Sequence, residues 1–141
     1  MKFIFFCVIN LFLISNLIFS LDNNDADETW VVSNIRGVMH YSPDFKFEES
    51  KLAQKKLIIS FSENSGMVSG TDSKFIKLDE NTLIGVSTNG KGAALYEIYQ
   101  INRKHKKMHL TVTRVGSETI LPNFPDKAGA YVGDAKLVSN D

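Results

Sequence analysis

The chain has 141 residues, with 16 basic and 16 acidic side chains, 43% hydrophobic residues and a single cysteine. This length is enough for one small domain with one hydrophobic core. The balanced charge argues against a nucleic-acid-binding protein, because such proteins need a basic face to contact the phosphate backbone.

The first twenty residues are predicted to be a signal peptide. Lys2 precedes an apolar run that extends to Phe19, and the chain becomes acidic after Ser20. A short positive region, an apolar region and a small residue at a polar border are typical of a secretory signal peptide. Because the apolar run approaches the ~17 residues that can just span a bilayer, an uncleaved membrane anchor is the alternative.

Cleavage after Ser20 would leave an exported chain with no membrane span and no cysteine, since Cys7 lies in the apolar run. Residues 21–28 are acidic and are expected to form a disordered leader. Residues 29–141 are expected to form a single β domain that is held together without disulfides. The absence of an N-glycosylation sequon after Ser20 fits a protein of the bacterial periplasm or a secreted bacterial protein.

The dominant pattern beyond the leader is an alternation of apolar and polar residues, which is typical of half-buried strands. Residues 47–56, FEESKLAQKK, are expected instead to form a helical turn or two, because early glutamates and late lysines suit the helix dipole. In chain order, the expected strands are TWVVSNIRGVMHYS (29–42), KLIISFS (56–62), KFIKL (74–78), TLIGVST (82–88), AALYEIYQI (93–101), MHLTVTRV (108–115) and AYVGDAKLV (130–138).

Most of these runs are joined by short connections that contain turn residues, which favours pairing between strands that are adjacent in the chain. The sequence therefore predicts an all-β domain, an antiparallel meander of about seven or eight strands that forms a small barrel or sandwich.

The segment YEIYQINRKHKKMHLTV (96–112) is predicted to be a hairpin with a basic tip. In its second strand Met108, Leu110 and Val112 share one face, which predicts one buried and one solvated side. The tip is expected to be a solvated turn, and a patch for phosphate or lipid headgroups is the alternative. Its basic residues are Arg103, Lys104, Lys106 and Lys107.

This hairpin resembles one found near the end of many small exported bacterial proteins of unknown function. In those proteins an aromatic-rich strand runs into Ile-Asp-Arg and a Thr-Gly turn. Ile101, Asn102 and Arg103 match this pattern with Asn in place of Asp, and Lys106 stands where the turn glycine would be. The resemblance implies an exported β domain and brings no activity with it.

No catalytic or metal-binding motif is found in the sequence. His105 and His109 have a spacing that suits a metal site only on a helix, and the alternation there predicts strand and turn. No cysteine remains after Ser20 to act as a nucleophile, and no serine lies in a Gly-x-Ser-x-Gly motif. We therefore expect no enzyme activity and no cofactor.

Two classes of function remain open. In the first, a barrel of eight strands holds a small hydrophobic or amphipathic ligand. An arginine that faced inward from a strand would need an anionic partner. The candidate ligand contacts are Trp30, Tyr96, Tyr99 and Arg114, and the alternative is that the aromatic residues only fill the core.

In the second class, the domain has no ligand pocket and contacts an envelope protein through an edge strand or a loop. The predicted loop at 116–130 suits this function, because it places the apolar residues Ile120, Leu121 and Phe124 next to two prolines, Pro122 and Pro125. The two classes differ in the barrel interior, which would be hollow in the first class and filled in the second.

Overall fold

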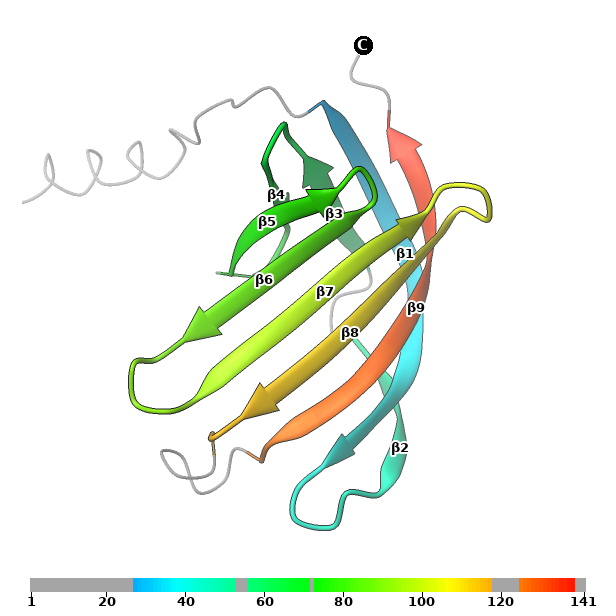
Figure 1. Ribbon diagram of the computed structural model, residues 1–141. Helices are drawn as coiled ribbons and strands as arrows, with labels where there is room; N and C mark the ends of the chain where they lie inside the picture. The colour runs from blue at the N-terminus through cyan, green and yellow to red at the C-terminus, as the bar shows by residue number, and fades with distance from the viewer. Residues whose placement is uncertain (1–26, 53–55, 72, 118–124, 139–141) are drawn as a thin grey trace, which may run out of the picture.

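The computed structural model describes residues 27–52, 56–71, 73–117 and 125–138, and these ranges contain nine antiparallel β-strands (Figure 1). The strands are β1 Glu28–Tyr41, β2 Phe47–Lys51, β3 Lys56–Phe61, β4 Ser65–Val68, β5 Lys74–Asp79, β6 Thr82–Thr88, β7 Ala94–Asn102, β8 Lys107–Val115 and β9 Lys127–Val138.

Eight of these strands form a closed barrel. From β3 to β9 each strand pairs with the next one in the chain, and β1 pairs with β3. The barrel closes because β9 pairs with β1, from Thr29 opposite Val138 to Tyr41 opposite Lys127. The predicted all-β meander is therefore confirmed, and its architecture is an eight-stranded antiparallel barrel with β2 as one extra strand.

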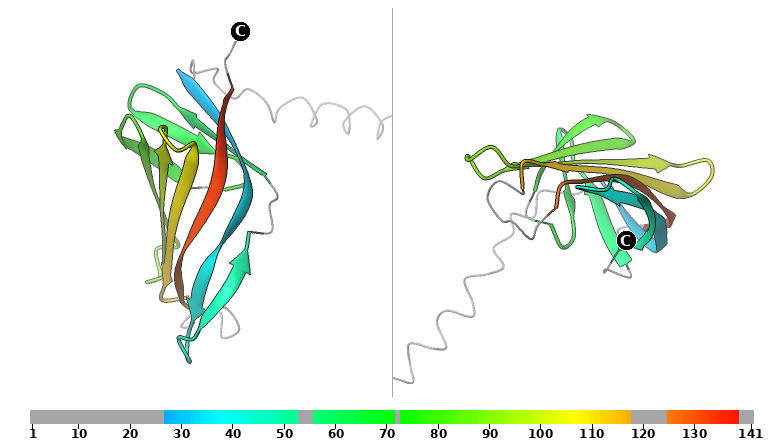
Figure 2. Two further views of the ribbon diagram at one scale, coloured as in Figure 1. Left: turned by 90° about the vertical axis from the view of Figure 1, so that its right-hand side faces the viewer. Right: turned by 90° about the horizontal axis from the view of Figure 1, so that it is seen from below.

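The long strand β1 pairs with three others. Its first half, up to Ser33, pairs with β3, and its second half, from Arg36, pairs with β2. Between these halves the pairing with β9 shifts at a β-bulge, where Asn34 has a φ of 53°. A bulge bends a strand and increases its twist. Figure 2 shows β1 and β9 curving together along one side of the barrel.

The structure corrects the expectation of a helical turn at 47–56. Phe47–Lys51 is strand β2, because it pairs with the edge of β1 that β3 leaves open beyond Ser33. A helix of two turns is marginal by itself, so pairing with an open strand edge outweighs the charge pattern. Residues 53–55 lie outside the described residues.

Two further segments differ from the sequence-based expectations. Strand β4 has no counterpart among the expected strands, since SGMV offers few apolar residues for a pattern. Strand β9 begins at Lys127, inside the predicted loop 116–130. The expected contact residues of that loop, Ile120, Leu121 and Phe124, lie outside the described residues.

Large side chains fill the middle of the barrel. A Cβ atom at Gly85 would lie 2.4 Å from the ring of Phe75, and one at Gly129 would lie 2.3 Å from Met39 Sδ. Glycines on the inner wall thus leave room for neighbouring large residues. The buried apolar residues are Trp30, Val32, Ile35, Met39, Leu57, Ile59, Phe61, Val68, Phe75, Leu83, Tyr99, Ile101, Met108, Leu110, Val112, Tyr131 and Ala135.

Candidate functional site

One end of the barrel, where β1 and β8 finish and β9 begins, has a polar inner wall. The register places Ser87 opposite Leu95, Leu95 opposite Arg114, and Arg114 opposite Lys127. Tyr41 stands opposite Lys127 on the other side. All five residues are half-buried and alternate with outward-facing neighbours, so they share the inner face. We call this row of five residues the rim.

A buried carboxylate lies one row deeper than the rim. Glu97 is only 8% exposed, and its oxygen Oε2 accepts hydrogen bonds from Ser73 Oγ at 2.9 Å and Thr71 Oγ1 at 3.4 Å. The hydroxyl of Tyr99 donates to Oε1 at 3.1 Å. Burial, and then the charge and the hydrogen bond of Glu97, raise the pKa of Tyr99. Within the described part of the chain, the carboxylate is thus satisfied by hydroxyl groups rather than by a direct ion pair.

The two rim cations are partly removed from water. Burial lowers the pKa of Lys127, repulsion from Arg114 lowers it further, and Glu97 acts in the opposite sense. Burial also lowers the pKa of Arg114, while Tyr41 and Asp126 act to raise it. An arginine nevertheless keeps its charge at any physiological pH. Two positive charges therefore stand on adjacent strands of the inner wall.

Hydrogen bonds that Arg114 donates to the chain beside the rim hold its side chain in place. Its Nη2 donates to the carbonyl oxygen of Pro125 at 2.6 Å, and its Nε donates to the same oxygen at 3.2 Å. The next residue, Asp126, accepts hydrogen bonds from the backbone N–H groups of Gly116 at 3.1 Å and Ser117 at 2.9 Å. The hydrogen bond from Ser117 N–H is the largest of several effects that lower the pKa of Asp126, so this carboxylate stays charged.

At the opposite end of the barrel, an ion pair lies over the single tryptophan. Arg103 Nη1 lies 2.7 Å from a carboxylate oxygen of Glu28, and its guanidinium lies 5.8 Å from the centre of the Trp30 ring. The indole N–H of Trp30 also donates to Glu28. Trp30 is only 4% exposed. It therefore lies in the apolar core, at the end of β1 away from the rim (Figure 1).

The structure brings together only part of the predicted ligand-contact set. Tyr99 and Arg114 both face the interior, where Tyr99 contacts Glu97 and Arg114 belongs to the rim. Tyr96 points to the outside of the barrel and is 44% exposed. Trp30 lies at the other end, so these four residues do not line one site.

The basic tip divides into two parts. Lys104 and Lys106 are exposed in the turn between β7 and β8, and Lys106 has a φ of 52°. Arg103 folds back onto Trp30, and Lys107 forms an ion pair with Asp134. The tip is thus a turn whose two flanking cations already have protein partners.

Sequence reasoning missed two of the most informative charged residues. Glu97 lies on the same face of β7 as Tyr99. A charged residue on the otherwise apolar face of a strand is unusual, and this was the signal in the sequence that could have identified it. Lys127 was hidden because β9 begins within the predicted loop. Its pairing with Arg114 depends on the register of two strands, which no local pattern specifies.

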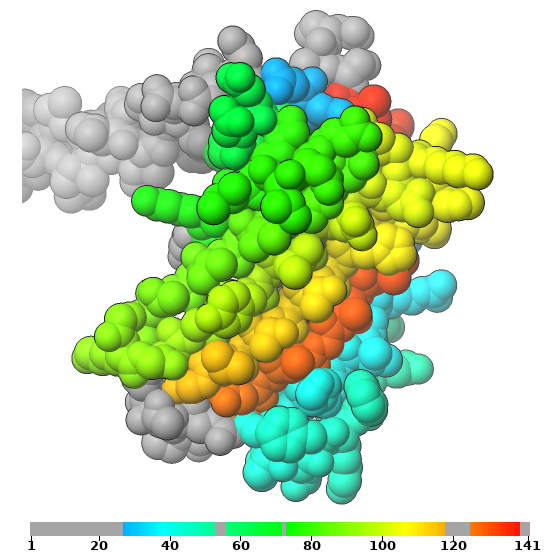
Figure 3. Space-filling view, in the orientation of Figure 1, coloured from blue at the N-terminus to red at the C-terminus, as the bar shows by residue number. Residues whose placement is uncertain are grey.

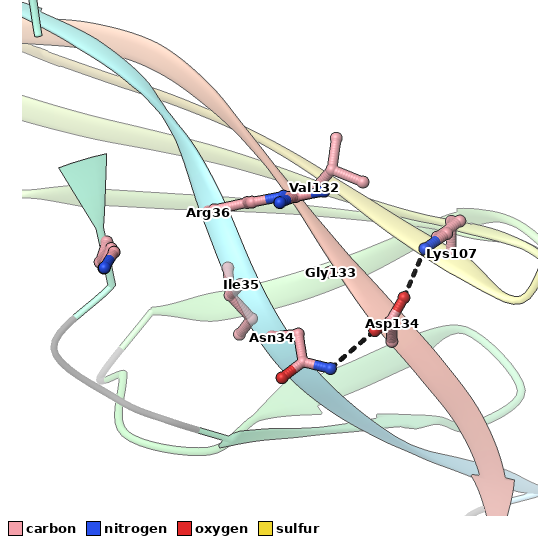
Figure 4. A pocket seen from close by; sticks show the side chains of 8 residues that line it. Asn34, Ile35, Arg36, Lys107, Val132, Gly133 and Asp134 are labelled. Atoms are coloured by element: carbon pink, nitrogen blue, oxygen red, sulfur yellow. Dashed lines mark hydrogen bonds and ion pairs between the residues drawn. The ribbon is translucent and has the colours of Figure 1, made fainter. Parts of the chain in front are cut away.

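A hollow of about 470 Å³ lies on the outside of the barrel at the bulge of β1 (Figure 4). Asp134 accepts a hydrogen bond from Asn34 Nδ2 at 2.8 Å and is ion-paired with Lys107. The side chain of Arg36 extends towards Val132 on the neighbouring strand β9. This surface is separate from the rim, because it lies on the outer face of the same strands.

Among the described residues, no group of three or more histidine, cysteine, aspartate or glutamate side chains is placed to hold a metal ion. The part of the chain that the structure describes contains no helix long and apolar enough to cross a membrane. Comparisons of the chain with models of protein families, with curated proteins and with solved structures find no match. The class that the structure itself defines is a small closed antiparallel β-barrel of eight strands.

Proposed function

We propose that this protein is an exported β-barrel that binds a small amphipathic molecule through an anionic head at the rim. The pairing of Arg114 with Lys127 on the inner wall supports this proposal. Like charges that lie side by side and are partly removed from water repel each other, and an anion between them would offset both that repulsion and the loss of hydration. Charged residues with perturbed pKa values recur at binding sites.

The surroundings of the two cations suit the rest of such a ligand. Leu95 lies beside Arg114 in the rim, and Val112 lies one row deeper on β8. Met39 occupies the neighbouring space on β1, and a methionine side chain adapts readily when a ligand enters. Because large side chains fill the middle of the barrel, the apolar part of the ligand would stay at the rim end, against these three residues.

Titration of the isotope-labelled domain with sodium decanoate, below its micelle concentration, tests the proposal. Decanol has the same chain without the negative charge and is the matched control ligand. We expect saturable shifts of backbone amide signals in 94–97 and 112–115 with decanoate, and much weaker shifts with decanol. The affinity for decanoate should also fall as salt is added, because ions screen the two cations.

Lys127→Met should weaken decanoate binding by about tenfold, because it removes one of two partly desolvated charges and keeps a side chain of similar length. Lys74→Met is the matched control variant, since Lys74 is exposed on the outer face of β5. Equal binding of decanoate and decanol, or equal effects of the two substitutions, would contradict an anion site at the rim.

A further inference from the structure

The outer face of β1, β2 and β9 holds two cations side by side on neighbouring strands. Arg36 on β1 stands opposite Lys51 on β2, and neither belongs to an ion pair within the described residues. Both line the 470 Å³ hollow at the bulge and an adjoining hollow of about 1040 Å³. Glu49 is the carboxylate that lines the second hollow beside them.

The floor between these cations is apolar. Val38 on β1 and Val132 on β9 are 44% and 40% exposed, and Ala130 lies next to them. At the far side of the first hollow, Lys107 is held by Asp134, whose carboxylate also accepts a hydrogen bond from Asn34. Figure 3 shows the side chains of β1 and β2 (cyan) rising beside the surface of β9 (orange).

The shape of this surface favours an extended peptide over a small molecule. Sites for small molecules bury most of the ligand, whereas both hollows are open on the outer face of the sheet. The surface extends over four neighbouring strands in the order β8, β9, β1 and β2. At normal strand spacing these four strands span a width of about 14 Å. A peptide of about four extended residues spans that width.

We infer that this outer surface, defined by Arg36, Lys51, Val38, Ala130 and Val132, binds an extended segment of a partner protein in which acidic and apolar residues alternate. Alternation places acidic side chains on one side of an extended peptide and apolar side chains on the other. The apolar side chains would cover Val38, Ala130 and Val132, and the long side chains of Arg36 and Lys51 would extend past the edge of the peptide to its acidic groups. The site does not depend on ligand binding at the rim, which lies on the inner face.

Fluorescence anisotropy with a labelled octapeptide of alternating glutamate and valine tests this inference on the full domain. We expect saturable binding that weakens at least about tenfold between low salt and 0.5 M salt, because the attraction is between exposed charges. A glutamine–valine octapeptide is the control for the apolar contribution and should bind at least about tenfold more weakly.

Lys51→Glu should weaken peptide binding at least about tenfold without lowering the melting temperature, because it places a carboxylate opposite Arg36. Arg36→Ser should also weaken binding, while Lys56→Ser serves as a matched control on the exposed start of β3, because Lys56 lines neither hollow.

Equal binding of the two octapeptides, or equal effects of the Lys56 and Arg36 substitutions, would overturn the inference. Binding of vesicles containing phosphatidylglycerol that is lost in both Lys51→Glu and Arg36→Ser, without binding of the glutamate peptide, would overturn it in favour of a lipid surface. Decanoate binding at the rim should be the same in both variants. The two sites are therefore tested separately.

Discussion

Replacing Tyr99 by Phe removes a single oxygen atom from the barrel interior and tests the buried network around Glu97. Tyr99 is 3% exposed, and its hydroxyl donates to Glu97 Oε1 at 3.1 Å. Hydrogen bonds to charged groups contribute about 1.5–3 kcal/mol to stability. Because Ser73 still donates to the other carboxylate oxygen, we expect Tyr99→Phe to cost about 1–2 kcal/mol in the free energy of unfolding.

Urea unfolding followed by the emission of Trp30 measures this change, because Trp30 is the only tryptophan and is buried. For a domain of this size, about 1 kcal/mol corresponds to a shift of about 4 °C in the melting temperature. A loss below about 0.5 kcal/mol, the range of ordinary surface substitutions, would refute the view that this hydrogen bond stabilises the buried carboxylate.

The same variant has a predicted effect at alkaline pH. The pKa of Tyr99 is raised in the folded protein, while a tyrosine in the unfolded chain ionises at about pH 10. Above that pH the unfolded chain releases a proton that the folded protein keeps, so stability falls as the pH rises. Tyr99→Phe should reduce this alkaline loss, measured as urea midpoints at pH 8 and pH 10.5. An unchanged difference between the two midpoints would contradict the assignment.

Four further outcomes are expected. Leu110→Asp should unfold the domain, as measured by far-UV circular dichroism, because Leu110 is 1% exposed. An unpaired buried charge costs several kcal/mol, against a total free energy of unfolding of roughly 5–15 kcal/mol. Lys106→Glu in the exposed turn should change stability by about 0.5 kcal/mol or less. Lys106→Gly should raise stability by about 0.5 kcal/mol in urea unfolding, because glycine adopts a φ of 52° without strain. Hydrogen bonds from Lys107 and then from Asn34 lower the pKa of Asp134 in the folded protein. The stability that this carboxylate contributes is therefore present above pH ~4 and is lost as the pH falls through its pKa in the folded protein. Asp134→Asn should lessen the drop in the urea midpoint between pH 7 and pH 3. N-terminal sequencing of the protein from cell fractions should find a start close to Leu21, and an intact Met1 in the membrane fraction would favour the anchor.

The sequence by itself determined the fold class and most of the strands. Alternation within β8 identified Leu110 as a buried residue and His109 as an outward one, because successive side chains of a strand point to opposite faces. The pattern in β7 did not separate Tyr96 from Tyr99, because both were expected to contact a ligand, and only the structure places Tyr96 outside and Tyr99 inside. Short turns between the runs determined the meander, since adjacent strands with short connections pair with each other.

Only the tertiary structure decided which charged residues meet. Arg114 and Lys127 are partners because β8 and β9 pair in one particular register, and Glu97 comes near them from a third strand. The strand at Phe47–Lys51 forms because β1 has an open edge at that point, which outweighs the local helical pattern. Local sequence encodes the direction of each side chain, whereas register, closure and edges depend on pairing between segments far apart in the chain.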